Sequence, residues 1–167
     1  MTGVAAHLNA LDEDDARTAL LRCCACEEWA DAMLTERPFA SDEALFEASD
    51  RLWGSLTPAH WREAFAAHPR IGGKVNATSS TAAWSRGEQS GMDSASASVA
   101  EALAEGNAAY EARFGHVFLI CATGRSAEEM LAALTSRLQN DSETELRIAK
   151  EQQALITRLR LTKLVNA

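Results

Sequence analysis

The stretch "NDSETELRIAKEQQALITRLRLTKLVNA" (140–167) decides the fold class. Positions on one of its faces recur every three or four residues, which is the spacing of a helix rather than a strand. They are Leu146, Ala149, Gln153, Ile156, Leu159 or Arg160, and Leu164. Asn140 and Glu143 match the capping box, in which the first and fourth residues each bond the other's backbone amide. We therefore predict a long amphipathic helix that begins after Asn140.

Start signals for further helices recur upstream of this stretch. Ser126 and Glu129 form a second capping box. Ser41 followed by two acidic residues opens another helix. Thr57 is an N-cap followed by Pro58, which is tolerated at the first helical position because its missing N–H would be unpaired there anyway.

Only "HVFLICA" (116–122) has the composition of an extended segment. One such segment cannot form a sheet alone, and no β-rich partner exists elsewhere. The run "NATSSTAAWSRGEQSGMDSASAS" (76–98) resembles a linker but carries Trp84, Glu88 and Gln89. We predict an all-α fold: a compact multi-helix bundle, one domain over 1–167, with a short extended segment near 116–122 and one ordered polar loop.

Length and charge exclude several classes of protein. The 167 residues suffice for one domain with a sizeable core. The net charge is −8 and the basic residues are dispersed, so no nucleic-acid partner is expected. No apolar run approaches the ~20 residues of a membrane span, so no membrane partner is expected. The N-terminal stretch lacks the features of a secretory signal, and we predict a cytoplasmic protein.

The cysteines comprise a cluster of Cys23, Cys24 and Cys26 and a distant Cys121. In a helix, Cys23 and Cys26 would share a face while Cys24 points elsewhere. A metal site would need a second Cys or His pair at comparable spacing, and none is present. We predict no metal site and interpret these residues as buried free thiols that behave as small hydrophobic side chains.

The stretch "AHPRIGGK" (67–74) is the first candidate functional motif. Pro69 disfavours helical geometry at His68, and Gly72 and Gly73 permit a turn. The imidazole is thereby presented at a helix end, and histidine is suited to proton transfer near neutral pH. The alternative is a structural role, in which His68 and Arg70 stabilise the negative end of the helix dipole.

Two further groups of polar residues are candidates. In "SRGEQSG" (85–91) a hydroxyl, a carboxylate and an amide could bind a small polar ring, although a solvated loop has the same composition. Arg158 and Arg160 point in different directions on a helix, so one can face the core. A buried guanidinium needs an anionic partner such as a bound carboxylate; the alternative is two solvated arginines.

Four motifs occur in an order that resembles one family. They are "HPRIGGK" (68–74), "SRGEQSG" (85–91), "YEARFGHVFLICATGRSAEEMLAALTSRLQND" (110–141) and "ELRIAKEQQALITRLRLTKL" (145–164). From Arg37 to its end the chain resembles 2-oxo-4-hydroxy-4-carboxy-5-ureidoimidazoline (OHCU) decarboxylases, and more loosely so through the first helix. The resemblance implies an all-α homodimer that needs no metal or organic cofactor and that decarboxylates a small ureidoimidazoline to (S)-allantoin in urate degradation.

The resemblance also implies roles for particular residues. His68 would donate or accept a proton, and Glu88 and Arg160 would be the other catalytic residues. The residues implied to bind the substrate are Pro69, Ser85, Arg86, Gly87, Glu88, Gln89, Phe118, Leu119, Ile120, Cys121 and Ala122. No role is assigned to His116. Two other functions stay open: a non-catalytic helical interaction module, and a hydrolase of cyclic ureides on the same scaffold.

Overall fold

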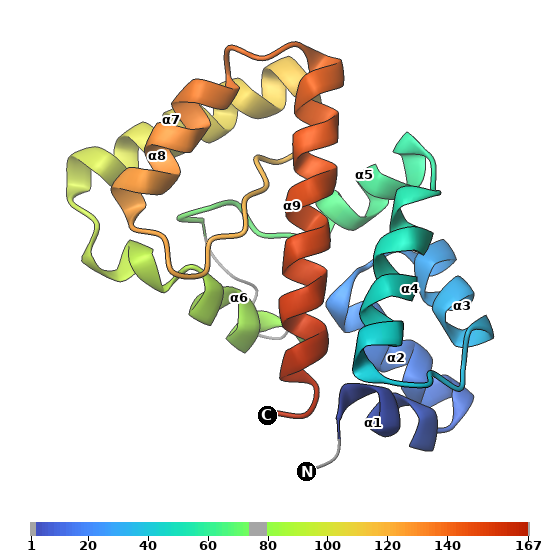
Figure 1. Ribbon diagram of the computed structural model, residues 1–167. Coiled ribbons are helices and arrows are strands. Elements are labelled where there is room, and N and C mark those ends of the chain that lie inside the picture. The colour runs from blue at the N-terminus through green and yellow to red at the C-terminus, as the bar shows by residue number, and fades with distance from the viewer. Residues whose placement is uncertain (1–2, 74–79, 167) are drawn as a thin grey trace. The chain divides into compact units, whose positions relative to one another are not determined.

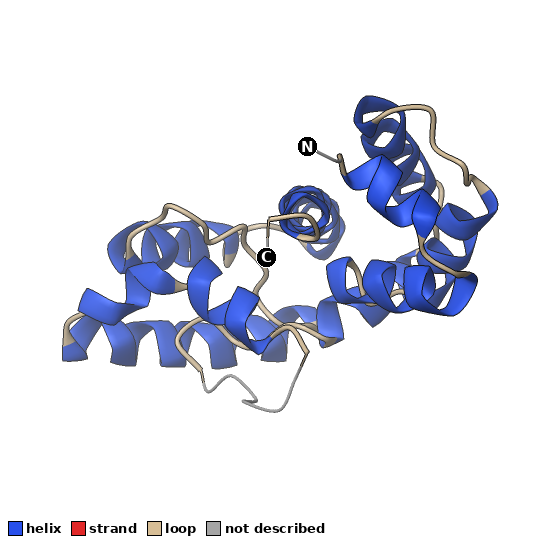
Figure 2. Ribbon diagram, turned by 90° about the horizontal axis from the view of Figure 1, so that it is seen from below, coloured by secondary structure: helices blue, strands red, loops and turns tan. Residues whose placement is uncertain are grey.

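Helices form all of the regular structure in residues 3–73 and 80–166, the part of the chain that the computed structural model describes (Figures 1 and 2). No strand occurs in these ranges, so the predicted all-α class is confirmed. None of the described helices is long and apolar enough to span a membrane. The elements are α1 (Val4–Ala10), α2 (Glu13–Cys23), α3 (Glu27–Thr35), α4 (Asp42–Gly54), α5 (Pro58–Ala66), α6 (Ala82–Glu88), the 3-10 helix η1 (Ser90–Ser94), α7 (Ala97–Phe114), α8 (Ala127–Arg137) and α9 (Ser142–Lys163).

The chain divides into two compact units. Unit 1 comprises Met1–Ala64 and Ala154–Ala167, and unit 2 comprises Phe65–Gln153. Helix α9 therefore contributes its first half to unit 2 and its second half to unit 1. That residues 1–167 act as a single domain stays a prediction.

Unit 1 is built on α1 to α4, in which α3 packs against both α2 and α4. The fully buried Trp29 of α3 donates its indole N–H to the Ser49 carbonyl of α4 at 3.3 Å. Ser41 caps α4 by accepting from the Ala44 amide at 3.0 Å, as predicted. The unit is thus held by an aromatic core residue whose single polar atom is hydrogen-bonded.

The cysteine cluster lies at a break between two helices. Helix α2 ends at Cys23, Cys24 is extended, and Cys26 is the extended residue that precedes α3. The expectation that Cys23 and Cys26 share one helix face is therefore wrong. All three are buried free thiols, as predicted, whereas Cys121 is partly exposed. Burial raises the pKa of Cys23 to about 12, so this sulfur stays protonated and unreactive at neutral pH.

Unit 2 surrounds a buried ion pair between Arg137 of α8 and Glu145 of α9. The Arg137 Nε donates to Glu145 Oε1 at 2.6 Å, and the Tyr110 hydroxyl donates to the same oxygen at 2.5 Å. Arg137 Nη1 also donates to the Leu119 carbonyl at 2.7 Å. This last bond anchors the 116–122 segment, which lies outside the helices as predicted and pairs with no strand in the described ranges.

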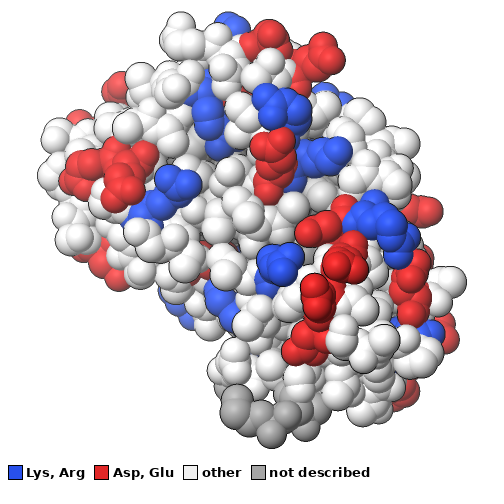
Figure 3. All heavy atoms as spheres, viewed as in Figure 1, with Lys and Arg blue, Asp and Glu red and all other residues white. Residues whose placement is uncertain are grey.

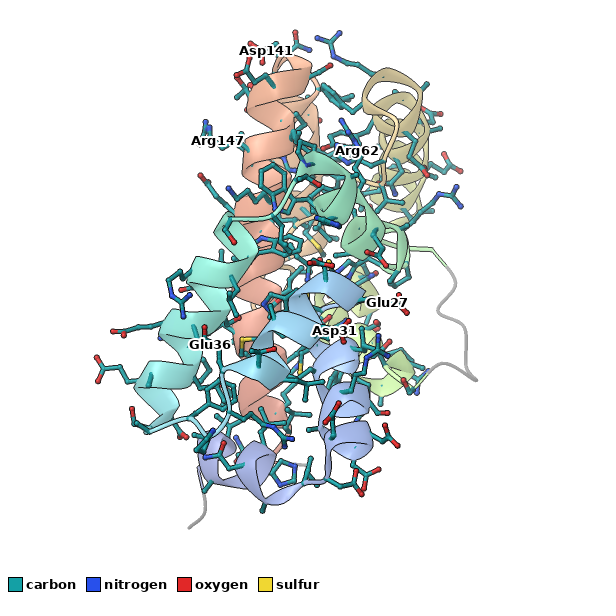
Figure 4. The ribbon with its side chains drawn as sticks, turned by 90° about the vertical axis from the view of Figure 1, so that its right-hand side faces the viewer. Glu27, Asp31, Glu36, Arg62, Asp141 and Arg147 are labelled. Atoms are coloured by element: carbon teal, nitrogen blue, oxygen red, sulfur yellow. The ribbon has the colours of Figure 1, made fainter. Side chains whose placement is uncertain are left out.

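The start of α9 differs from the prediction. Asp141, not Asn140, caps the helix by accepting from the Thr144 amide at 2.7 Å, and this bond lowers the Asp141 pKa (Figure 4). The Asn140 side chain instead donates to Glu145 Oε2 at 3.2 Å. A buried carboxylate thus draws Asn140 away from the capping position. The Ser126–Glu129 capping box is confirmed at α8.

Glu145→Ala should lower the free energy of unfolding by about 3–5 kcal/mol, because it leaves the Arg137 charge buried without its carboxylate. Urea denaturation would measure the loss. The matched control is Glu151→Ala on the exposed side of the same helix, where the ion pair with Arg147 contributes at most about 0.5 kcal/mol. Equal losses for the two variants would contradict the structural role of the buried pair.

Candidate active site

His68 lies two residues beyond the end of α5, outside helical geometry as its position before Pro69 predicts. Its backbone amide donates to the Phe65 carbonyl at 3.1 Å. Its ring Nε2 lies 2.7 Å from the side-chain oxygen Oε1 of Gln153 on α9. The imidazole is partly buried. Gln153, which is far along the chain, holds it at the end of α5.

The turn that follows His68 is tied to α6 by Gln89. The Gln89 oxygen accepts from the Gly72 amide at 3.0 Å, and its nitrogen lies 3.5 Å from the Arg70 carbonyl as a donor. Gly72 has a φ of +78°, which a side chain would strain. Arg70 pairs with Glu111 at 2.8 and 3.1 Å. The principal partner of Arg70 is therefore this carboxylate. The structural alternative had instead placed the Arg70 charge against the end of α5.

The residues of "SRGEQSG" lie on two short helices, apart from Gln89, which joins them, rather than in a loop. Residues 82–88 form α6 and 90–94 form η1, so the predicted polar loop is wrong over these residues; 76–79 lie outside the described ranges. Ser85 and Glu88, three residues apart, share a buried face of α6. Arg86 and Gly87 are exposed. Helical periodicity thus separates an inward hydroxyl and carboxylate from two outward residues.

The 118–122 segment is held through its backbone. The Cys121 amide donates to Gln152 Oε1 at 2.8 Å, and its carbonyl accepts from Arg125 Nε at 3.1 Å. Phe118, Ile120 and Ala122 belong to the hydrophobic core of unit 2, and Leu119 is buried as well. These contacts give the segment a fixed course without a sheet. That its backbone contacts the substrate stays a prediction.

Arg160 belongs to unit 1 and is the buried arginine of the pair on α9. It is 5% exposed and donates to the Arg22 carbonyl at the end of α2 at 3.3 Å. Leu159 is 38% exposed, which settles which of these two positions faces inward. Arg158 is exposed, lies over the Phe46 ring at 4.5 Å and is 3.6 Å from Asp50. The two arginines therefore have different environments.

Within unit 2 the structure connects three of the predicted groups. Gln89 joins α6 to the turn after His68, Gln153 joins His68 to α9, and Gln152 joins α9 to Cys121. Neither Gln152 nor Gln153 was predicted to serve the site. The sequence nevertheless contained an indication of this contact: Gln153 is a polar residue among positions of the last helix that face the core. A buried amide requires a hydrogen-bond partner, which here is the His68 ring.

The described residues were also searched for metal-binding groups and for patches of one charge. Among residues 3–73 and 80–166, no three His, Cys, Asp or Glu side chains are grouped so as to hold a metal ion. On the face drawn in Figure 3, acidic and basic side chains of the described residues are interspersed, without a continuous basic patch.

Comparison with known proteins gives a consistent result. Residues 9–162 match the sequence model of the family described as OHCU decarboxylase. The chain is 42% identical over 147 residues to the "Uric acid degradation bifunctional protein TTL" of Arabidopsis thaliana, covering 86% of this chain but only 45% of that protein. It is 33% identical over 143 residues to the 2-oxo-4-hydroxy-4-carboxy-5-ureidoimidazoline decarboxylase of Amia calva, covering 84% of this chain and 82% of that one.

A solved structure agrees. The crystal structure of an OHCU decarboxylase in the presence of (S)-allantoin superposes with a TM-score of 0.77 at 36% identity, over 88% of this chain and 96% of that one. The fold and these matches define an all-helical decarboxylase, a carboxy-lyase. In particular, the chain belongs to the OHCU decarboxylase family.

Gly72→Ala should destabilise the protein by about 1–2 kcal/mol, because a Cβ is disfavoured at a φ of +78° and would lie 3.1 Å from the Met92 Cε. Urea denaturation would measure the change. Gly54→Ala is the control, since its added Cβ would meet no atom within 4 Å other than its own helix backbone and chain neighbours, and its φ is not positive. A neutral Gly72→Ala would show that the turn does not need the left-handed conformation.

Proposed function

We propose that the chain catalyses the cofactor-free decarboxylation of 2-oxo-4-hydroxy-4-carboxy-5-ureidoimidazoline to (S)-allantoin in urate degradation. The observation that carries the proposal is the His68 imidazole, oriented by Gln153 at 2.7 Å within the HP motif of a chain that belongs to this family. An oriented imidazole is what a proton transfer to one face of a ring requires.

The chemistry explains why no electron-accepting cofactor is needed. The carbon that loses CO2 carries a hydroxyl group and adjoins a carbon–nitrogen double bond. When the C–C bond to the carboxylate breaks, CO2 leaves; the electron pair forms a carbon–carbon double bond, and the π pair of the carbon–nitrogen bond moves to the nitrogen, which takes up a proton. The resulting enediol-like intermediate then loses its hydroxyl proton to form the carbonyl group and takes up a proton on one face of the neighbouring carbon. His68 supplies the general acid–base group for this proton, a contribution of roughly 10²–10⁴-fold in rate.

The other polar residues bind and orient the substrate in this proposal. Glu88 holds the hydroxyl group, Ser85 adds a hydrogen bond from the same face of α6, and Arg160 orients the anion. The buried position of Ser85 and Glu88 supports this, since buried polar groups on one face make directional contacts. The proposal also assigns substrate contacts to Pro69, Arg86, Gly87, Gln89 and the backbone of residues 118–122.

Assembly and compartment form part of the proposal. A homodimer rests on the family resemblance, and the exposed Leu155 and Leu159, one turn apart on α9, offer apolar surface of the kind that an interface needs. A cytoplasmic location is supported by the four free cysteines, which are typical of a reducing compartment. Analytical ultracentrifugation and fractionation of cells test these two points.

A coupled assay distinguishes the proposal from its alternatives. Freshly generated substrate is supplied, and CO2 release and the optical activity of the allantoin are followed together. The decarboxylase yields both signals at a rate proportional to protein concentration. A hydrolase of cyclic ureides would consume the compound without releasing CO2, and an interaction module would change neither signal.

His68→Asn should fold normally yet lose about 10²–10⁴-fold in the rate of enantioselective allantoin formation, because asparagine cannot act as a general acid or base near neutral pH. Circular dichroism checks the fold and polarimetry measures the reaction. A variant with the wild-type rate would remove His68 from the mechanism.

Arg160→Lys should lower the rate or the affinity by about ten- to hundredfold, because lysine lacks the planar fork that holds a carboxylate in two bonds. Arg158→Lys is the matched control on the same helix, and its exposed contacts with Phe46 and Asp50 predict almost no effect. Steady-state decarboxylation and calorimetry of allantoin binding compare the two variants. The reverse outcome would exclude Arg160 as the anion-binding residue.

A further inference from the structure

Gln153 is a polar side chain at a core-facing position. It is 0% exposed and lies in the half of α9 that belongs to unit 2. Burying an amide without hydrogen bonds costs free energy. A glutamine at this position therefore needs hydrogen-bond partners for its side chain. Its oxygen lies 2.7 Å from the His68 Nε2, across 85 positions of sequence.

The direction of this hydrogen bond defines the protonation of the imidazole. An amide oxygen only accepts, so in this arrangement the hydrogen bond forms when the His68 Nε2 carries a hydrogen and donates it. In the neutral ring the other nitrogen, Nδ1, then holds the lone pair. A histidine without such a partner exchanges between the two arrangements, and only a fraction of the molecules has the basic nitrogen in a given place.

We propose that Gln153 is a positioning residue that holds His68 in the Nε2–H tautomer and thereby makes Nδ1 the nitrogen that exchanges a proton with the substrate. The inference rests on the proposed role of His68 in decarboxylation. Gln153 itself acts through the imidazole and does not contact the reacting atoms.

Two backbone features support the same orientation. The His68 amide is bonded to the Phe65 carbonyl at 3.1 Å, which limits rotation of the residue about the end of α5. Pro69 restricts the conformations open to His68. The neighbouring Gln152 bonds the Cys121 amide at 2.8 Å. Because successive residues on a helix point about 100° apart, these two glutamines reach two different segments from one turn of α9.

Substitutions at position 153 separate acceptor chemistry from packing. Gln153→Met keeps an unbranched side chain of similar length but removes the acceptor. Gln153→Glu keeps an oxygen acceptor at the same distance from the backbone. We expect kcat to fall about tenfold in Gln153→Met with KM within about twofold, the lower end of the loss seen when a partner that orients a metal-bound histidine is removed. Gln153→Glu should restore most of kcat.

The direct readout is the tautomer, observed by ¹⁵N NMR of the full chain labelled at histidine, with His68→Asn used for assignment. The wild-type protein should show a single His68 ring form with an observable Nε2–H resonance. Gln153→Met should lose this resonance and Gln153→Glu should keep it. Glu151→Gln is the control: it changes an exposed side chain, paired with Arg147, that precedes the two glutamines in the sequence.

Several outcomes would overturn the inference. A wild-type spectrum with the proton on Nδ1 does so even if no variant folds. Wild-type kcat in Gln153→Met also does so, as does a rise in KM at constant kcat, which would indicate substrate binding instead. Failure of the proposed function has a different signature, because His68→Asn would then keep the decarboxylation rate while the Nε2–H resonance of wild-type protein stayed dependent on Gln153.

Discussion

The buried ion pair between Arg137 and Glu145 is the interaction on which the rest of unit 2 depends. Two charges removed from water are stabilised by further hydrogen bonds to their other polar atoms. Tyr110 and Asn140 supply donors to the carboxylate, and the Leu119 carbonyl accepts from the guanidinium. One pair therefore joins α7, α8 and α9 to a segment that has no sheet to hold it. The same network explains why Asn140 does not cap α9.

Helix α9 connects this ion pair to the candidate site, because residues of both lie on it. About two turns beyond Glu145, one turn of the helix presents Gln152 and Gln153, which accept hydrogen bonds from the Cys121 amide and the His68 ring. A rigid helix is a better support than a loop for groups whose geometry must be held within a fraction of an ångström. The irregular segments at 67–73 and 116–122 therefore take their positions from side chains of α7, α8 and α9 and from Gln89 rather than from their own backbone pairing.

The sequence motifs predicted part of the site correctly and part incorrectly. The position of His68 outside the helix followed from Pro69, a restriction that acts between neighbouring residues. The polar loop around Ser85 and Glu88 was wrong because Gly, Ser and Thr lower helix propensity without forbidding a helix once one face is buried. The capping residue of α9 was misplaced by one position because both candidates, Asn140 and Asp141, have suitable side chains and a buried carboxylate competes for the first.

The sequence by itself determined the all-α class, the starts of α4, α5 and α8, and the place of a histidine beyond a helix end, because hydrophobic period, caps and proline act over a few residues. Only the tertiary structure decided that Arg160 rather than Leu159 faces inward, that Gln89 holds the turn after His68, and that Gln153 orients the imidazole. The last two depend on contacts between segments 17 and 85 positions apart. Local pattern carries no record of such contacts, since the same glutamine at a core-facing position is compatible with any buried partner that can donate to it.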